Sequence, residues 1–137
     1  ASGAGSDLLD LQIASASKFS VSKSGDALAS GDYLLENPIN TQTGTAYTLA
    51  ITDAGRTVRM DNGSAIALTV PPNSSVAFPV GTQIVIEQSG AGAVTVTAGA
   101  GVTLYSRGSL VSTAGQYALA ALVKTATDTW TLGGDIA

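Results

Sequence analysis

The chain has 137 residues and a formal net charge of -4, and only 12% of its residues are charged although 45% are hydrophobic. Soluble domains usually carry about 25% charged residues. The six Lys and Arg are scattered singly and form no basic stripe for a phosphate backbone, so we expect no nucleic-acid partner. Cys and His are absent, which excludes disulfides, thiolate zinc sites, thiol catalysis and His acid-base chemistry.

Residues 1–40 are predicted to form short strands joined by tight turns. In LLDLQI and KFSVS, apolar residues alternate with polar ones, which is typical of a strand with one buried face. The stretch KSGD (23–26) is a turn signal. A segment with so few large apolar residues rarely folds alone. We therefore expect a stalk-like segment that is covered by identical chains or by the rest of the protein. Its candidate core residues are Leu9, Leu11, Ile13, Phe19 and Val21.

The stretch ENPINTQTG (36–44) is the best candidate boundary, because turn-forming residues gather there without periodicity. We therefore expect an N-terminal segment over 1–40 and a domain over 41–137. Short strands separated by turn signals at a spacing of roughly ten residues predict an all-β fold, an antiparallel β-sandwich or barrel of about eight strands. The predicted strands are 46–51, 56–60, 65–70, 82–88, 93–98, 101–106, 116–124 and 128–133.

Three connections between the predicted strands allow specific predictions. Asn62-Gly63 is the type of pair that a two-residue hairpin turn favours. Pro71-Pro72 cannot donate to a ladder, so the preceding strand is expected to end there. In the loop 71–81, Val76, Phe78 and Val80 alternate and are expected to pack under the sheet, although such a loop is also a place for receptor contacts.

The longest apolar run, 117–123, has the length of a strand, far short of the roughly 18–20 residues of a membrane span. We therefore expect no membrane insertion. None of the three GAG stretches completes a dinucleotide or phosphate-binding motif. We expect neither a cofactor nor a metal site.

Carboxylate chemistry is the main enzymatic possibility to weigh. Asp53 and Asp61 flank a strand and would have to lie about 5 to 10 Å apart to act as a glycosidase pair. In DAG and DNG contexts, however, Asp is more often a turn residue that accepts backbone N–H bonds. Glu87, in an apolar strand, is expected to pair with an Arg or to lie at an oligomer interface. We therefore expect no enzyme activity.

The aromatic residues are few, so most are needed in the core. Trp130 is expected to be buried, because it alternates with Leu132 against threonines. Tyr105 and Arg107 are the candidate exposed contacts for a receptor or a surface glycan, because Tyr suits amphipathic contact surfaces.

Two stretches resemble segments of fibrous virion proteins of tailed bacteriophages and prophages. The first is LLDLQIASASKFSVSKSGDALASGDY (8–33). The second, 47–135, resembles a β-rich module of the same kinds of protein, through DAGRTVRM, VPPNSSVAFPVGTQI, GAGAVTVTAGAGV and QYALAALVKTATDTWTLGGD. The resemblance implies a non-catalytic structural protein of the virion, usually a homotrimer with other virion proteins as partners, on a tail fibre, head fibre or baseplate appendage.

Other hypotheses remain open. One is a monomeric carbohydrate-binding module that uses Tyr105 and Arg107, and another is a capsid decoration protein. A depolymerase would use Asp53 and Asp61, or Glu87. Complete fibres are commonly longer, so we expect either a fragment of one or a short protein mounted on another.

Overall fold

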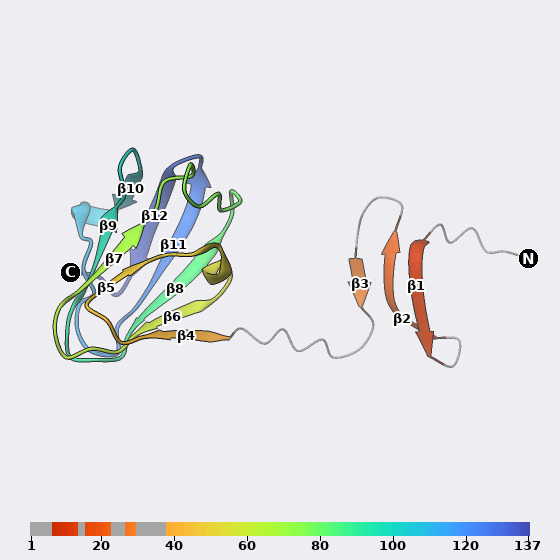
Figure 1. Cartoon of the computed structure of the whole chain (residues 1–137), viewed down its shortest axis with the longest axis horizontal. Helices are drawn as coiled ribbons and strands as arrows, with labels where there is room; N and C mark the ends of the chain where they lie inside the picture. Colours follow the sequence, from red (N-terminus) through yellow and green to blue (C-terminus); the bar gives the residue numbers. More distant parts are fainter. Residues whose placement is uncertain (1–6, 14–15, 23–26, 30–37) are drawn as a thin grey trace, which may run out of the picture. The chain divides into compact units, whose positions relative to one another are not determined.

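In the computed structural model, residues 7–13, 16–22, 27–29 and 38–137 are described, with side chains for 38–137. The chain divides into two compact units, Ala1–Glu36 and Asn37–Ala137 (Figure 1). Both units are built from β-strands, and the predicted all-β class is confirmed. No helix in the described part of the chain has the length and apolar character needed to cross a membrane.

The first unit contains a three-stranded antiparallel sheet. Its strands are β1 (Asp7–Ile13), β2 (Ala16–Ser22) and β3 (Ala27–Ala29), in the order β1-β2-β3. The backbone register places Leu9 opposite Val21 and Leu11 opposite Phe19. The side chains of these predicted core residues and of Ile13 lie outside the described ones, so the predicted oligomer core stays a prediction.

The second unit is a pair of facing sheets (Figure 1). The larger sheet has the order β10-β12-β11-β8-β6-β4 and the smaller one the order β5-β7-β9. Two short 3-10 turns, η1 (Ile51–Asp53) and η2 (Arg107–Ser109), interrupt the strands. The strands are β4 (Ile39–Gln42), β5 (Ala46–Thr48), β6 (Thr57–Met60), β7 (Ile66–Val70), β8 (Gln83–Gln88), β9 (Val94–Ala98), β10 (Thr103–Ser106), β11 (Leu119–Ala126) and β12 (Thr129–Gly134).

All eight strands predicted for this unit are present, and one more was missed. Strand β4 lies inside the stretch 36–44 that was predicted to be a boundary, and it pairs with β6. The division between the units accordingly falls at Glu36 and Asn37. This division lies within the predicted boundary stretch, and only β4 is unexpected there, because the strand INTQ carries polar residues on both faces and so lacks the apolar alternation that marks a strand.

The strand pairing differs from the predicted antiparallel one. From β4 to β9 the chain alternates between the two sheets, so that strands neighbouring each other within a sheet run parallel. Among the named strands of this unit, β11 alone forms antiparallel pairs, with β8 and β12, and β10 joins β12 in parallel. The reason lies in the turns, because Asn62-Gly63 joins β6 to β7 in the opposite sheet and does not form a hairpin.

The core fills the space between the two sheets. Inward residues of the larger sheet include Val58, Ile86 and Leu122, all fully buried, and they meet Leu68 and Val94 of the smaller sheet. The outward residues of β9 are Thr95 and Thr97, and such threonines form hydrogen-bonded rows with neighbouring strands. This alternation is the period-2 pattern that the sequence predicted.

The loop 71–81 closes one end of the core. Strand β7 ends at Val70, as Pro71-Pro72 predicted. Phe78 is 3% exposed and packs edge-to-face against Trp130, which is 1% exposed, with ring centroids 5.4 Å apart. The burial predicted for Trp130 and Phe78 is confirmed, and Val76 packs against the core. Val80 was predicted to be buried but is 63% exposed, because the chain turns away before β8.

Glycines allow successive turns of the chain to stack. A Cβ on Gly90 would lie 2.2 Å from the Asn62 carbonyl oxygen, and one on Gly92 would lie 1.9 Å from the Ser64 carbonyl oxygen. Both distances are shorter than any real Cβ contact. The GAG stretch at 90–92 therefore serves close packing of backbones, which explains its small residues.

The interior beside β4 is polar. The Asp53 side chain, 1% exposed, accepts hydrogen bonds from Asn40 Nδ2 at 2.7 Å, the Tyr47 hydroxyl at 2.9 Å and the Ala50 backbone N–H at 2.8 Å. Gln42 Nε2 donates to Asn40 Oδ1 at 2.7 Å. Asp53 thus accepts a backbone N–H, as its DAG context predicted. We call Asn40, Gln42, Tyr47 and Asp53 the polar cluster.

Ionisation of Tyr47 in the polar cluster is expected to lower the stability of this unit at alkaline pH. Burial and the hydrogen bond to Asp53 raise the pKa of Tyr47 above its ordinary value of 10.0. A raised folded-state pKa means that the hydroxyl stabilises the fold fully below pH 10 and that this contribution is lost as pH rises through the folded pKa. We expect the free energy of unfolding to fall above pH 10 and Tyr47→Phe to remove the Tyr47 part of that fall. Urea unfolding at several pH values between 8 and 11 measures this fall. If the free energy of unfolding of Tyr47→Phe fell with pH as steeply as that of the original chain, the expectation would be contradicted.

Candidate functional site

A pocket with a volume of about 540 Å³ lies between two segments of the chain, each of which crosses from the larger sheet to the smaller one. Its lining residues are Arg107, Gly108, Leu110, Gly133, Gly134 and Ile136. One wall is the connection after β10, and the other is the end of β12 with the residues that follow it. The sequence prediction included Arg107 but none of the others.

The two walls are held together by main-chain hydrogen bonds. After η2, the chain joins the smaller sheet beside β9, where Val96 N–H donates to the Val111 carbonyl at 2.8 Å. The C-terminal residues then pair with this added segment, because Ala137 N–H donates to the Ser112 carbonyl at 2.9 Å. The pocket therefore lies between two chain segments that main-chain hydrogen bonds hold in place.

Left-handed backbone conformations shape both walls. Gly108 and Ser109 have φ of 65° and 61°, and Gly134 has φ of 124°. Only Gly adopts the last conformation readily. A Cβ on Gly134 would also lie 2.6 Å from the Leu119 carbonyl oxygen, whereas one on Gly133 would meet nothing within 4 Å. Gly134 is thus required by the fold, and Gly133 can be changed to narrow the pocket.

The lining combines one cation with apolar and main-chain surface. Arg107 is exposed, and the one ion pair among residues 38–137 joins Arg59 to Glu87, which leaves the Arg107 guanidinium without a carboxylate partner there. A guanidinium offers a planar set of donors that matches a carboxylate or a phosphate. Leu110 and Ile136 add apolar contact surface. Such a site suits a small organic group that carries an anionic substituent.

Tyr105 lies near the pocket but does not line it. It is on β10, opposite Thr131 of β12, and it is 61% exposed. Arg107 follows β10 as the first residue of η2, two positions after Tyr105. The structure therefore brings the predicted contact pair to neighbouring positions, of which only Arg107 belongs to the pocket wall.

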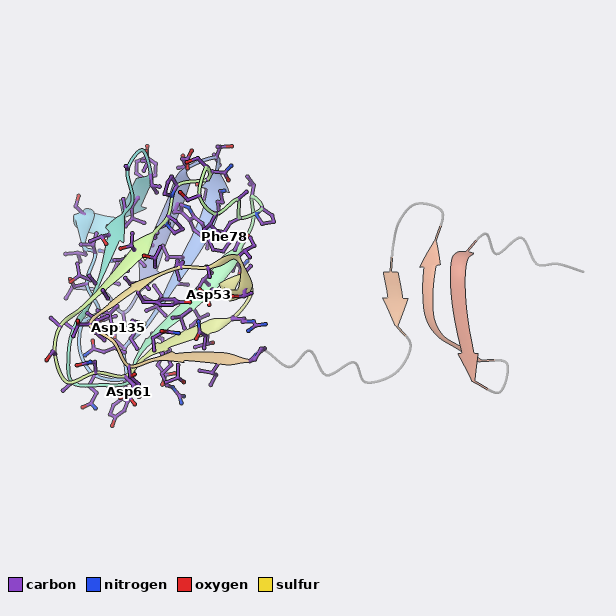
Figure 2. All side chains as sticks on the ribbon, viewed as in Figure 1. Asp53, Asp61, Phe78 and Asp135 are labelled. Atoms are coloured by element: carbon purple, nitrogen blue, oxygen red, sulfur yellow. The ribbon has the colours of Figure 1, made fainter. Side chains whose placement is uncertain are left out.

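The two candidate catalytic aspartates do not meet. Asp53 precedes β6 and Asp61 follows it, and Figure 2 shows them apart in the unit. Four strand residues at about 3.3 Å each separate their backbones by roughly 13 Å. Asp53 is committed to the polar cluster, and Asp61 is exposed in the turn after β6.

Glu87 is a member of an ion pair between neighbouring strands. Arg59 Nε of β6 lies 2.9 Å from Glu87 Oε2 of β8, at directly paired positions. The prediction that Glu87 pairs with an Arg is confirmed. Within the residues that the structure describes, no three acidic side chains gather as a metal site would require.

The residues that the sequence prediction missed are mostly glycines and chain-end residues. Gly133 and Gly134 end the last strand, β12, and Ile136 follows it, where the sequence signals only that the strand ends. The pocket depends on two crossings that are distant in sequence, and local alternation carries no information about such a meeting. Comparisons of the chain with protein-family models, with curated proteins and with solved structures found no match.

Proposed function

We propose that the chain is a homotrimeric structural protein of a tailed bacteriophage or prophage particle. It acts in a fibre or appendage of the virion and contributes to attachment to the host surface, through contacts with other virion proteins and with surface glycans. The proposal rests on the sequence resemblance and on one structural observation, the small sheet of the first unit.

That sheet is small, since its strands have seven, seven and three residues. Three strands with a hydrophobic face are near the lower limit for independent stability. The paired positions Leu9 with Val21 and Leu11 with Phe19 carry large apolar residues, and opposite positions share one face of a sheet. Three copies that meet around an axis would cover one another, which is why we favour a homotrimer.

The larger sheet of the second unit supports assembly as well. Its inward positions are filled by the core, yet Ile39, Tyr105 and Leu119 on its other face are 49%, 61% and 54% exposed. These residues lie on β4, β10 and β11, and the proposed assembly would cover them. The low share of charged residues has the same explanation, since surface that is covered in an assembly needs no charge.

The acidic side chains support a structural role over a catalytic one. Asp53 accepts three hydrogen bonds in a buried cluster, and Glu87 is paired with Arg59. These groups hold loops and strands in place, and removing them is expected to change stability.

The location in a virion can be tested by labelling. An antibody raised against this protein is applied to phage particles induced from the bacterium that encodes the chain, and the particles are examined by electron microscopy. We expect the label at a fibre or appendage of the particle. Unlabelled particles, with the protein recovered only in the particle-free fraction, would refute the virion proposal and leave the carbohydrate-binding alternative.

The attachment role predicts a specific dependence on the pocket. A surface glycan that carries a carboxylate or a phosphate would pair with Arg107, and losing a charge-assisted bidentate contact costs about 1.5–3 kcal/mol. We therefore expect Arg107→Ala to weaken glycan-array binding by at least tenfold and Gly133→Leu to weaken it by filling the pocket. Arg56→Ala, outside the pocket, is the matched control. Equal binding by all three variants would refute the pocket as the contact site.

A further inference from the structure

The most unusual charged group of the second unit is Lys124 of β11. It is 2% exposed, and its Nζ donates to Asn73 Oδ1 and to the Phe78 carbonyl, both at 2.6 Å. The Trp130 ring centroid lies 5.9 Å away. No carboxylate forms an ion pair with it among the described residues. A buried ammonium without a counter-ion is unfavourable, whereas an amide at the same place has no charge to bury.

We propose that Lys124 and Asn73 form an intramolecular isopeptide bond. The nitrogen that would attack and the side-chain carbonyl that would be attacked already lie side by side. The reacting groups are also preorganised, because Nζ is held by the Phe78 carbonyl and Asn73 is held through its own N–H. Such fixed proximity is a large part of the acceleration of intramolecular reactions.

The step balances without any oxidant or cofactor. The Nζ ammonium gives up one proton, its lone pair attacks Cγ of Asn73, and Nζ then gives up a second proton. The bond from Cγ to Nδ2 then breaks, Nδ2 takes up protons and leaves as ammonia, and the Lys124 nitrogen remains bonded to Cγ as an amide. No atom other than those of one ammonia molecule is lost.

Asp128 is the group that we assign to proton transfer. Its Oδ1 accepts the Asn73 backbone N–H at 2.6 Å, which holds the carboxylate beside the residue that reacts. Asp128 itself has a φ of 52° in the turn between β11 and β12, so the fold maintains an unusual backbone to place it there. Phe78 and Trp130, 3% and 1% exposed, lie beside the buried Lys124.

The bond would tie together the two sheets. Asn73 lies in the loop that follows β7 of the smaller sheet, and Lys124 lies on β11 of the larger one, 51 positions further along the chain. A covalent link across such a span restricts the unfolded chain in the way that a disulfide does. The chain has no Cys with which to form a disulfide.

Intact-mass measurement and tryptic mapping of the full chain test the proposal. The Gly63→Ala background is used, because cyclisation of the Asn62-Gly63 step also releases ammonia and a Cβ at Gly63 meets nothing within 4 Å. We expect the mass to be lower than the sequence mass by one ammonia. Trypsin should then release a branched product in which 60–107 is joined to 108–137, because an acylated Lys124 is not cleaved. A full sequence mass with separate peptides 60–107 and 108–124 would overturn the proposal.

Three variants define the reacting groups. Lys124→Arg keeps the charge but cannot form the link, and Asn73→Ala removes the acceptor, so both should retain the full mass. Asp128→Ala should also lose most of the branched peptide. The fluorescence of Trp130, the one Trp of the chain, reports whether each variant is folded. A branched peptide from Asn73→Ala would overturn the assignment of Asn73, and complete linkage in Asp128→Ala would overturn the role of the carboxylate.

Discussion

Gly92→Ala is expected to destabilise the second unit by about 3 kcal/mol or more, the upper range of overpacking effects. The added Cβ would lie 1.9 Å from the oxygen and 2.3 Å from the carbon of the Ser64 carbonyl, so it would collide with backbone. Backbone cannot swing aside as the end of a flexible side chain can. The turn after β6 would have to separate from the turn after β8, and the stacking of the chain on itself would be disturbed.

Urea unfolding followed by Trp130 fluorescence measures this effect. Gly115→Ala is the matched control, since its Cβ would meet nothing within 4 Å and its φ is not in the left-handed region. We expect the control to stay within about 0.5 kcal/mol of the original chain. If Gly92→Ala behaved as the control does, the close stacking of the two turns would be wrong.

Asp53→Ala is the second substitution with a large expected effect, about 3–5 kcal/mol, as is typical when a buried hydrogen-bond network is broken. Asp53 is 1% exposed, and the change leaves Asn40 Nδ2, the Tyr47 hydroxyl and the Ala50 N–H, all on half-buried residues, without their shared acceptor. Each unsatisfied buried donor costs about 1–3 kcal/mol, and entry of water offsets part of the sum.

Asp61→Ala separates this structural role from a catalytic one. Asp61 is exposed, so its loss is expected to change the free energy of unfolding by less than about 0.5 kcal/mol. A depolymerase that used the two aspartates would instead lose activity in both variants while Asp53→Ala stayed stable. Unfolding curves of the two variants, with release of oligosaccharides from capsule as a second readout, distinguish these outcomes.

The sequence predicted the strands well because alternation is a local property. Val94 and Val96 face the core while Thr95 and Thr97 face outward. Burial alternates in the same way along β11, although there Lys124 is buried and Leu119 is exposed. Strand β4 has no such pattern, because Asn40 and Gln42 face an interior that is itself polar. The burial of Asp53 is what makes these polar residues suitable there.

The path of the chain between strands could not be obtained in the same way. Asn62-Gly63 has the composition of a hairpin turn, yet here it carries the chain from one sheet to the other. The sequence does not indicate whether the next strand pairs with the previous one or belongs to the facing sheet. A strand has one buried face in either arrangement, so its alternation is the same. The pocket was missed for the same reason, since Arg107 and Gly133 meet through crossings rather than through neighbouring sequence.

We propose that identical chains complete the small sheet of the first unit, and the oligomeric state tests this proposal most directly. Native mass spectrometry and light scattering of the full chain should give three times the mass of one chain. Leu11→Asp, at a position opposite Phe19, should dissociate this trimer, whereas Gln12→Asp on the same strand should leave it intact. A folded, monodisperse monomer at every concentration of the original chain would contradict the account.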